Sequence, residues 1–196
     1  GAAPGPTALY HAPPGLSGPR LPAGGARQVW NLSPGASEGM KALRFVADSM
    51  VGRLARWLRA LGFDVAYHPF ADDHQVIAWA RARQAVVLTR DTGMPRPPDV
   101  RVVFIRHDKV AAQLAQVARE MPLDLGATRP LTRCTVCNGE LAPASRDQVW
   151  RQIPPFIYLT HDRFARCPDC GRVYWEGSHA PRIRARVEAL RAAACE

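Results

Sequence analysis

The sequence predicts an α/β protein: a three-layer α/β/α sandwich with a parallel central sheet, followed by a zinc ribbon and a terminal helix. Three observations lead to this prediction. Short apolar runs alternate with segments of helical periodicity between residues 41 and 125, the pattern of a parallel sheet covered by helices on both faces. Two C-x-x-C pairs follow, and an apolar stripe at helical spacing closes the chain. With 196 residues, 47% of them hydrophobic, the chain can bury a sizeable core.

Strands and helices are expected to alternate in the first part of the chain. The predicted strands are 43–47, 63–67, 85–89 and 101–106. Helices are predicted at 49–61, from Asp72 and Asp73 onward, and at 109–121. The first helix carries an apolar stripe formed by Val51, Leu54, Leu58 and Leu61. Gly62 is expected to close it, and three arginines fall mostly outside the stripe: Arg53, Arg56 and Arg59.

The two C-x-x-C pairs predict a structural zinc site. They are formed by Cys134 with Cys137 and by Cys167 with Cys170. Two such pairs supply the four thiolates of a tetrahedral zinc ion, and the residues between them suffice for the strands of a ribbon. The alternative is four cysteines without metal. Because four thiolates complete the coordination, His161 and His179 in the same segment are expected to be structural.

Composition divides the chain into four segments. Residues 1–40 are rich in proline and glycine and predict a flexible tail. Residues 41–125 form the predicted α/β domain and residues 130–182 the zinc ribbon. Residues 183–196 predict a basic amphipathic helix that is able to dock on the ribbon, with an apolar stripe of Ile183, Val187 and Leu190.

The net charge of +9 and the pI near 10.0 point to a polyanionic partner. Of the 26 basic residues only Lys41 and Lys109 are lysine, and arginine presents a planar donor fork that suits phosphate. A nucleic acid is therefore the expected partner, and a merely solvated basic surface is the alternative. No apolar run approaches the length of a membrane span, and a reducing, cytoplasmic location is expected.

Aspartates follow the predicted strands. Asp48 and Asp91 come directly after buried strands, and Asp72 and Asp73 begin the helix after the second strand. The carboxyl ends of parallel strands meet at one edge of the sheet, so these side chains are expected to lie together. Crowded carboxylates favour a divalent cation, and their hard oxygens suit Mg²⁺ or Mn²⁺. Such ions can activate water for phosphodiester hydrolysis.

Each aspartate also has a structural explanation. Asp48 or Asp72 can cap a helix, and Asp91 opens a common turn sequence. Asp108 follows the last strand and is the weakest candidate, and Asp99 is expected to be solvated. Arg53, Arg56 and Arg90 flank the expected site and are candidates for binding phosphates, with a solvated helix face as the alternative. Two tryptophans are expected in the core rather than stacked on bases: Trp57 and Trp79.

The chain resembles the mut-seven C-terminal RNase domain family, a PIN-like nuclease fold fused to a zinc ribbon. The resemblance spans about residues 43 to 182, and the order of the motifs agrees as well as their content. The matching stretches of this sequence are 45–48, 52–59, 61–64, 71–73, 87–91, 133–138, 154–155, 160–162 and 167–179.

The resemblance implies a PIN-like α/β/α sandwich whose acidic residues bind Mg²⁺ or Mn²⁺ and cut RNA. Asp48, Asp91 and one or both of Asp72 and Asp73 would be the metal ligands. The alternative is a non-catalytic RNA- or ribosome-binding module that uses the same fold and ribbon as a basic docking surface. A DNA-binding regulator is disfavoured, because nothing between the two cysteine pairs provides a recognition helix.

Overall fold

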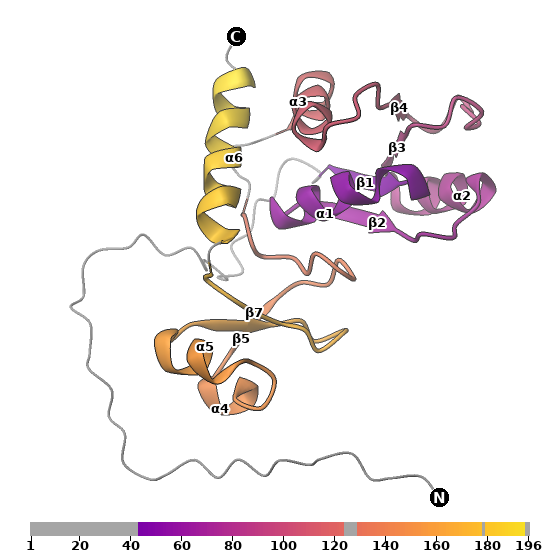
Figure 1. The fold of residues 1–196 in the computed structure, drawn as a ribbon. Coiled ribbons are helices and arrows are strands. Elements are labelled where there is room, and N and C mark those ends of the chain that lie inside the picture. Colours follow the sequence, from indigo (N-terminus) through magenta and orange to yellow (C-terminus); the bar gives the residue numbers. More distant parts are fainter. Residues whose placement is uncertain (1–42, 124–128, 178, 195–196) are drawn as a thin grey trace, which may run out of the picture.

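A computed structural model describes residues 43–123, 129–177 and 179–194 (Figure 1). The expected tail at residues 1–40 lies outside these described residues. The α/β part contains eight elements in chain order: β1 (Arg44–Ala47), the 3₁₀ helix η1 (Ser49–Val51), α1 (Gly52–Ala60), β2 (Asp64–Tyr67), α2 (Asp73–Arg83), β3 (Val86–Thr89), β4 (Val102–Phe104) and α3 (Val110–Glu120). The cysteine-containing part and the C-terminus contain six: β5 (Ala142–Ala144), α4 (Arg146–Val149), α5 (Pro155–Thr160), β6 (Phe164–Arg166), β7 (Val173–Trp175) and α6 (His179–Ala194).

The first four strands form one parallel sheet in the order β2-β1-β3-β4. In the register, Phe45 lies opposite Val65 on one side and Val86 on the other. The alternation of strands and helices thus correctly predicted a parallel sheet. Since β1 and β3 occupy the centre, the residues that follow them meet at the same edge.

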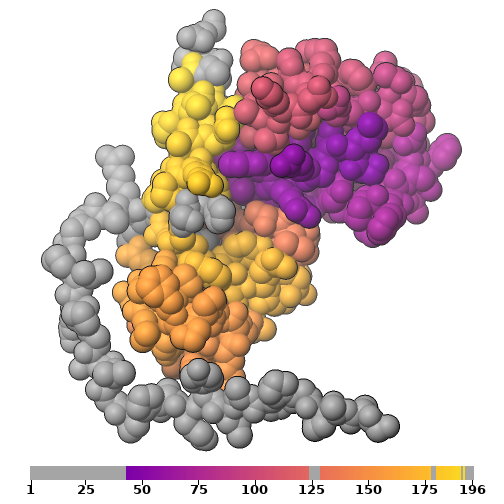
Figure 2. Space-filling model, in the orientation of Figure 1, coloured from indigo at the N-terminus to yellow at the C-terminus, as the bar shows by residue number. Residues whose placement is uncertain are grey.

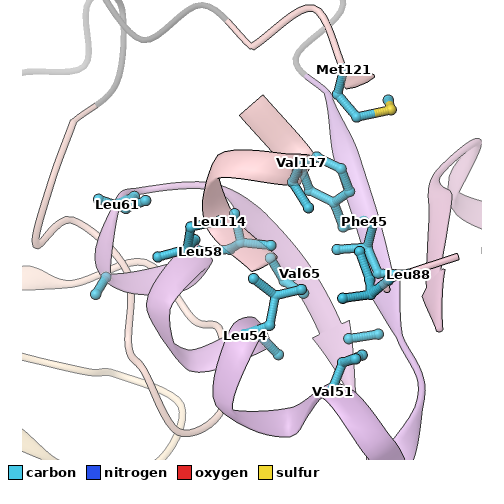
Figure 3. Packing of buried hydrophobic residues seen from close by; sticks show 14 of the residues in the cluster. Phe45, Val51, Leu54, Leu58, Leu61, Val65, Leu88, Leu114, Val117 and Met121 are labelled. Carbon is cyan, nitrogen blue, oxygen red and sulfur yellow. The ribbon is translucent and has the colours of Figure 1, made fainter. Parts of the chain in front are cut away.

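Helices cover both faces of this sheet. Phe45 and Leu88 face α1 and α3, where Leu54, Leu58 and Val117 complete a buried cluster (Figure 3). The neighbouring strand residues point the other way: Val46 and Val87 pack against α2 through Val76, Ile77 and Ala80. This two-sided burial gives the predicted three-layer sandwich.

Helix α6 packs against the sandwich. Its apolar stripe, Ile183, Val187 and Leu190, belongs to the same buried cluster as α1 and α3, and α6 contacts α3 directly. Figure 2 shows the surface of α6 continuing that of α3 and α1. The stripe was correctly identified from its spacing, but it covers the sandwich, whereas docking on the ribbon was expected. The helix begins at His179. Pro181 is tolerated in its first turn, because backbone amides there have no intrahelical acceptor.

The cysteine-containing part is a small antiparallel sheet with the order β5-β6-β7. Two short helices, α4 and α5, lie between β5 and β6. Its buried side chains are few, namely Val149, Ile153 and Phe164 in one cluster and Leu141 and Ala165 beside the cysteines in another. So small a core is expected to need a metal.

Among the described helices, none is both long and apolar enough to cross a membrane.

Candidate metal centres

Asp48 lies at the carboxyl end of β1 and is only 4% exposed. Its side chain caps η1, where Oδ1 accepts hydrogen bonds from the Met50 amide and from Ser49 Oγ at 3.2 Å. Oδ2 points to the neighbouring strand and accepts hydrogen bonds from Thr89 Oγ1 and from the Arg90 amide at 3.3 Å. Both oxygens are thus held by protein donors, and the buried carboxylate is fixed in orientation.

Thr89 connects two of the predicted site residues. This fully buried side chain donates a hydrogen bond to Asp48 Oδ2, and its Oγ1 accepts one from the Asp91 amide at 2.9 Å. Thr89 was not among the site residues predicted from the sequence. A polar residue that ends an otherwise apolar strand directly before Arg90 and Asp91 was the available signal.

Asp91 and Asp73 meet at the same edge of the sheet. Asp91 starts a turn in which Oδ1 accepts a hydrogen bond from the Gly93 amide at 2.8 Å. The pKa of Asp73 is raised above its ordinary value, first by desolvation and then by the negative charges of Asp91 and Asp48. The negative charges of both other carboxylates therefore act on Asp73. A divalent cation would relieve this repulsion.

Asp72 has a structural role. It is the N-cap of α2 and accepts a hydrogen bond from the Gln75 amide at 2.8 Å. The Gln75 side chain in turn accepts one from the Asp72 amide at 3.1 Å, which completes a capping box. Of the two adjacent aspartates, Asp73 is the one that lies on the helix with its charge acting on Asp48 and Asp91.

The acidic group fits a hard divalent cation by its chemistry. Within the described residues, Asp48, Asp73 and Asp91 take part in no ion pair with arginine, lysine or histidine. Their oxygens do not form a group within 4.8 Å of one another, whereas the four cysteine sulfurs do. Among the described residues the carboxylates at this edge of the sheet have no ion-pair partner, and closing around one ion would require side-chain movements.

The three arginines that were candidates for binding phosphate differ in their surroundings. Arg53 and Arg56 are exposed on α1, directly after the segment that Asp48 caps. Arg90 is turned toward β4, where its guanidinium donates to the His107 carbonyl at 3.1 Å and forms an ion pair with Asp108. Arg53 and Arg56 thus remain open to solvent, while Arg90 reaches the site mainly through its backbone amide.

The four cysteines come together as their spacing predicted. Their sulfurs all lie within 4.8 Å of one another, with Cys134 Sγ 3.6 Å from Cys170 Sγ and Cys137 Sγ 3.3 Å from Cys167 Sγ. Tetrahedral zinc–sulfur bonds of about 2.3 Å require sulfur separations of about 3.8 Å, so the four thiols fit a zinc ion.

Hydrogen bonds around Cys134 favour its thiolate. Burial acts to raise its pKa, but hydrogen bonds from the Cys137 amide and from the Tyr174 hydroxyl outweigh burial and lower the pKa to about 6. The thiolate is the form that binds zinc. His161 is not one of the four ligands and instead contacts Thr160 Oγ1 through Nδ1 at 2.8 Å.

Arg59 joins the two parts of the molecule. It was expected outside the core, yet it is only 2% exposed. Its Nε donates to the Val65 carbonyl at 2.9 Å, and its Nη1 donates to the Val136 carbonyl at 2.7 Å. Burial lowers the pKa of Arg59, against the raising effect of Cys134 and Cys137. The guanidinium therefore holds the first cysteine pair against β2.

The two tryptophans pack as expected. Trp57 lies against the cluster under α1 and α3, with the Arg186 guanidinium of α6 stacked 5.8 Å from its ring centroid. Trp79 packs against the cluster under α2. Neither ring is therefore presented to a base.

Neither a curated protein nor a solved structure matches the chain. The family model described as Mut7-C RNAse domain matches residues 43–187, which include β1 to β7, the four aspartates, all four ribbon cysteines and much of α6. The protein is therefore a member of the Mut7-C RNase domain family.

Proposed function

We propose that this protein is a metal-dependent ribonuclease whose Mg²⁺ or Mn²⁺ is held by Asp48, Asp73 and Asp91. The observation that carries the proposal is the raised pKa of Asp73, caused by desolvation and by the charges of Asp91 and Asp48. Asp73 lies within the electrostatic reach of two other carboxylates, and a pKa shifted in this way is common at functional sites. Membership of an RNase family makes RNA the expected substrate.

Each residue has a distinct role in this proposal. A bound Mg²⁺ or Mn²⁺ would supply an activated water and stabilise charge on the leaving oxygen. Asp48 is oriented by Thr89 and by the amides of Met50 and Arg90. Asp72 acts by capping α2, the helix that carries Asp73. Arg53 and Arg56 would bind RNA phosphates outside the acidic group, since they are exposed.

The ribbon would serve a structural and docking role. Zinc would be bound by Cys134, Cys137, Cys167 and Cys170 and would stabilise a segment with little core of its own. The basic surface of this segment would extend the contact with RNA. Four zinc-binding thiolates would require a reducing compartment, and we propose the cytoplasm.

Cleavage of a single-stranded RNA by the zinc-loaded protein, with and without Mn²⁺, tests the proposal. We expect cleavage that requires Mn²⁺ and falls by at least about 100-fold in Asp48→Asn and in Asp91→Asn. The matched control is Asp99→Asn, because Asp99 is an exposed aspartate of the same unit that pairs with Arg81 away from the acidic group. Cleavage that persists in both site variants would overturn the proposal.

One observation favours the non-catalytic alternative. Both oxygens of Asp48 accept hydrogen bonds from protein groups, as a purely structural carboxylate would. In that case the chain would bind RNA, alone or in a ribosome, without cutting it. The same experiment separates the two, since this alternative predicts RNA binding without Mn²⁺-dependent cleavage in the wild-type protein.

A further inference from the structure

Phe70 is an aromatic side chain with almost no cover. It is 86% exposed, and it belongs to the short loop between β2 and α2. Four other large hydrophobic side chains of the described residues are exposed, each to a smaller extent: Met50, Val136, Phe156 and Leu159. Phe70 belongs to neither of the two buried clusters of the sandwich, so its ring is available to contact a partner.

The loop holds the ring outward. The Phe70 amide donates to His68 Nδ1 at 3.3 Å, and the Ala71 amide donates to the His68 carbonyl at 3.3 Å. The two rings meet edge to face, with centroids 5.9 Å apart and an interplanar angle of 67°. The His68 ring thus contacts Phe70, whose ring stays largely exposed to solvent.

The loop belongs to the edge that carries the acidic group. Only Ala71 separates Phe70 from Asp72 and Asp73 in the chain. The negative charges of Asp91 and Asp48 act on Asp73. Tyr67, at the end of β2, lies against the start of α1, where a Cβ on Gly52 would come within 2.4 Å of its hydroxyl oxygen. The β2–α2 loop and the segment after Asp48 are therefore neighbours.

That second segment also exposes an apolar side chain. Met50 is 60% exposed, although its backbone amide is bound to Asp48. An exposed aromatic ring in the loop before α2 and an exposed thioether on η1 thus lie close in the chain to Asp73 and Asp48, and the exposed Arg53 follows Met50 on α1. Apolar faces beside cationic groups are what single-stranded RNA requires, because bases stack while phosphates seek positive charge.

We propose that Phe70, assisted by Met50, is a stacking surface for an unpaired nucleobase of RNA, placed next to the phosphate that the acidic group acts on. This inference rests on the proposed function, since it assigns a substrate contact to the same site. A lone ring and a neighbouring methionine are too small for a stable protein–protein interface, but one ring suffices to stack one base. Recognition is therefore through the base face and tolerates any base.

Binding of a fluorescein-labelled single-stranded oligouridylate tests the inference. Ca²⁺ replaces Mn²⁺, so that the carboxylates are neutralised without relying on turnover. We expect Phe70→Ala to bind about tenfold more weakly than wild type, and Phe70→Trp to bind at least as tightly as wild type. The matched control is Asp99→Asn, which alters an exposed side chain of the same α/β part that pairs with Arg81 away from the acidic group and is expected to cause no loss of binding.

An oligomer that carries abasic sites throughout separates stacking from other causes. It should bind wild type and Phe70→Ala alike, because it offers no base to stack. The inference would be overturned if the two proteins had equal affinity for oligouridylate. An equal loss of affinity with the abasic oligomer, or an equal loss in Asp99→Asn, would also overturn it. So would a change of oligomeric state in Phe70→Ala without a change in RNA affinity, which would make the ring a contact between copies of the chain.

The assay does not depend on cleavage. If the wild-type protein fails to cut RNA with Mn²⁺ while base-dependent binding through Phe70 persists, the ribonuclease proposal fails and the stacking surface stands. If the protein cuts RNA while Phe70→Ala keeps the wild-type affinity, the stacking surface alone fails.

Discussion

The side-chain carbonyl of Asn138 accepts a hydrogen bond from the backbone amide of Val65 at 3.0 Å. Val65 is in β2, the outer strand of the parallel sheet, and Asn138 directly follows the first cysteine pair. The Val65 carbonyl is bound by Arg59 at 2.9 Å, so both backbone groups on the open side of this residue are satisfied. The first cysteine pair thus closes part of an edge that would otherwise be available to another strand.

This closure predicts that zinc stabilises the sandwich as well as the ribbon. We expect Asn138→Gly to lower the free energy of unfolding by ~2 kcal/mol, because two hydrogen bonds are lost, to Val65 and to Asp64. Glycine is the suitable replacement, since Asn138 has a φ of 75°. Denaturant unfolding measures the loss.

Hydrogen exchange at the Val65 amide supplies the second measurement. Exchange should become faster in Asn138→Gly, and also in the wild-type protein after chelation of zinc. Val87, in the sheet centre, is the internal reference, and its amide donates to the Arg101 carbonyl. An unchanged rate at Val65 after zinc removal would show that the sheet edge is independent of the metal.

The surroundings of Asp64 predict that the protein loses folding stability in acid. Burial acts to raise its pKa, but the hydrogen bond from Asn138 and the charge of Arg83 outweigh burial and lower the pKa below its ordinary value of 3.8. A lowered native pKa contributes stability above the unfolded pKa, and that contribution is lost as the pH falls through the native pKa. Stability should therefore drop below about pH 4, and less steeply in Asp64→Asn.

Denaturant unfolding of both proteins between about pH 6 and pH 2.5 checks this difference. The two proteins share the same cysteines, so loss of zinc in acid affects both. Parallel stability curves for wild type and Asp64→Asn would contradict the assignment.

Thr89 is predicted to position the acidic group. Thr89→Val keeps the shape of the side chain but removes the hydroxyl that donates to Asp48 and accepts from the Asp91 amide. We expect a loss of ~1 to 3 kcal/mol in stability, together with weaker Mn²⁺ binding. If the proposed cleavage occurs, kcat should fall while KM for RNA stays near the wild-type value, because Thr89 does not contact solvent.

Thr89→Ser is the matched variant, since it restores a hydroxyl at the same position. It should recover most of the Mn²⁺ affinity. If valine and serine gave the same affinity as threonine, the hydroxyl would have no part in placing Asp48 and Asp91.

Replacing Gly62 with alanine should destabilise the protein more than the same change at a second glycine of similar backbone conformation. Gly62 has a φ of 97°, and a Cβ there would lie 2.4 Å from the Arg129 carbonyl oxygen. Gly171 has a φ of 75°, but its nearest neighbour would be Arg166 Nη2 at 3.6 Å. Gly171→Ala should cost ~1 to 2 kcal/mol from backbone strain alone, and Gly62→Ala clearly more. Equal unfolding midpoint shifts in the two variants would contradict the close approach.

The strands and helices could be predicted from the sequence because their signals are local. Apolar runs such as Val86 to Leu88, and the spacing of Leu54 and Leu58, depend on residues within one or two turns. The placement of aspartates after strands also followed from topology, since all parallel strands end at one edge. Periodicity and topology therefore sufficed for the sandwich, while the divalent-cation site at its edge stays a prediction.

Other features depend on residues that are distant in the sequence. Arg59 looked like a surface arginine, because the carbonyls that bury it belong to Thr135 and Val136. The apolar stripe of α6 was visible from its spacing and was assigned to the ribbon, and only the fold shows that it covers α1 and α3. The roles of the adjacent Asp72 and Asp73 were likewise inseparable until the capping box was visible.

Direct measurement of Mn²⁺ binding to the zinc-loaded protein tests the central claim, that Asp48, Asp73 and Asp91 share a divalent cation. The electron paramagnetic resonance signal of unbound Mn²⁺ reports the bound fraction. We predict saturable binding in wild type and in Asp99→Asn, and a loss of at least tenfold in affinity in Asp91→Asn and in Asp73→Asn. Equal binding, or equal absence of binding, in all four proteins would contradict the account.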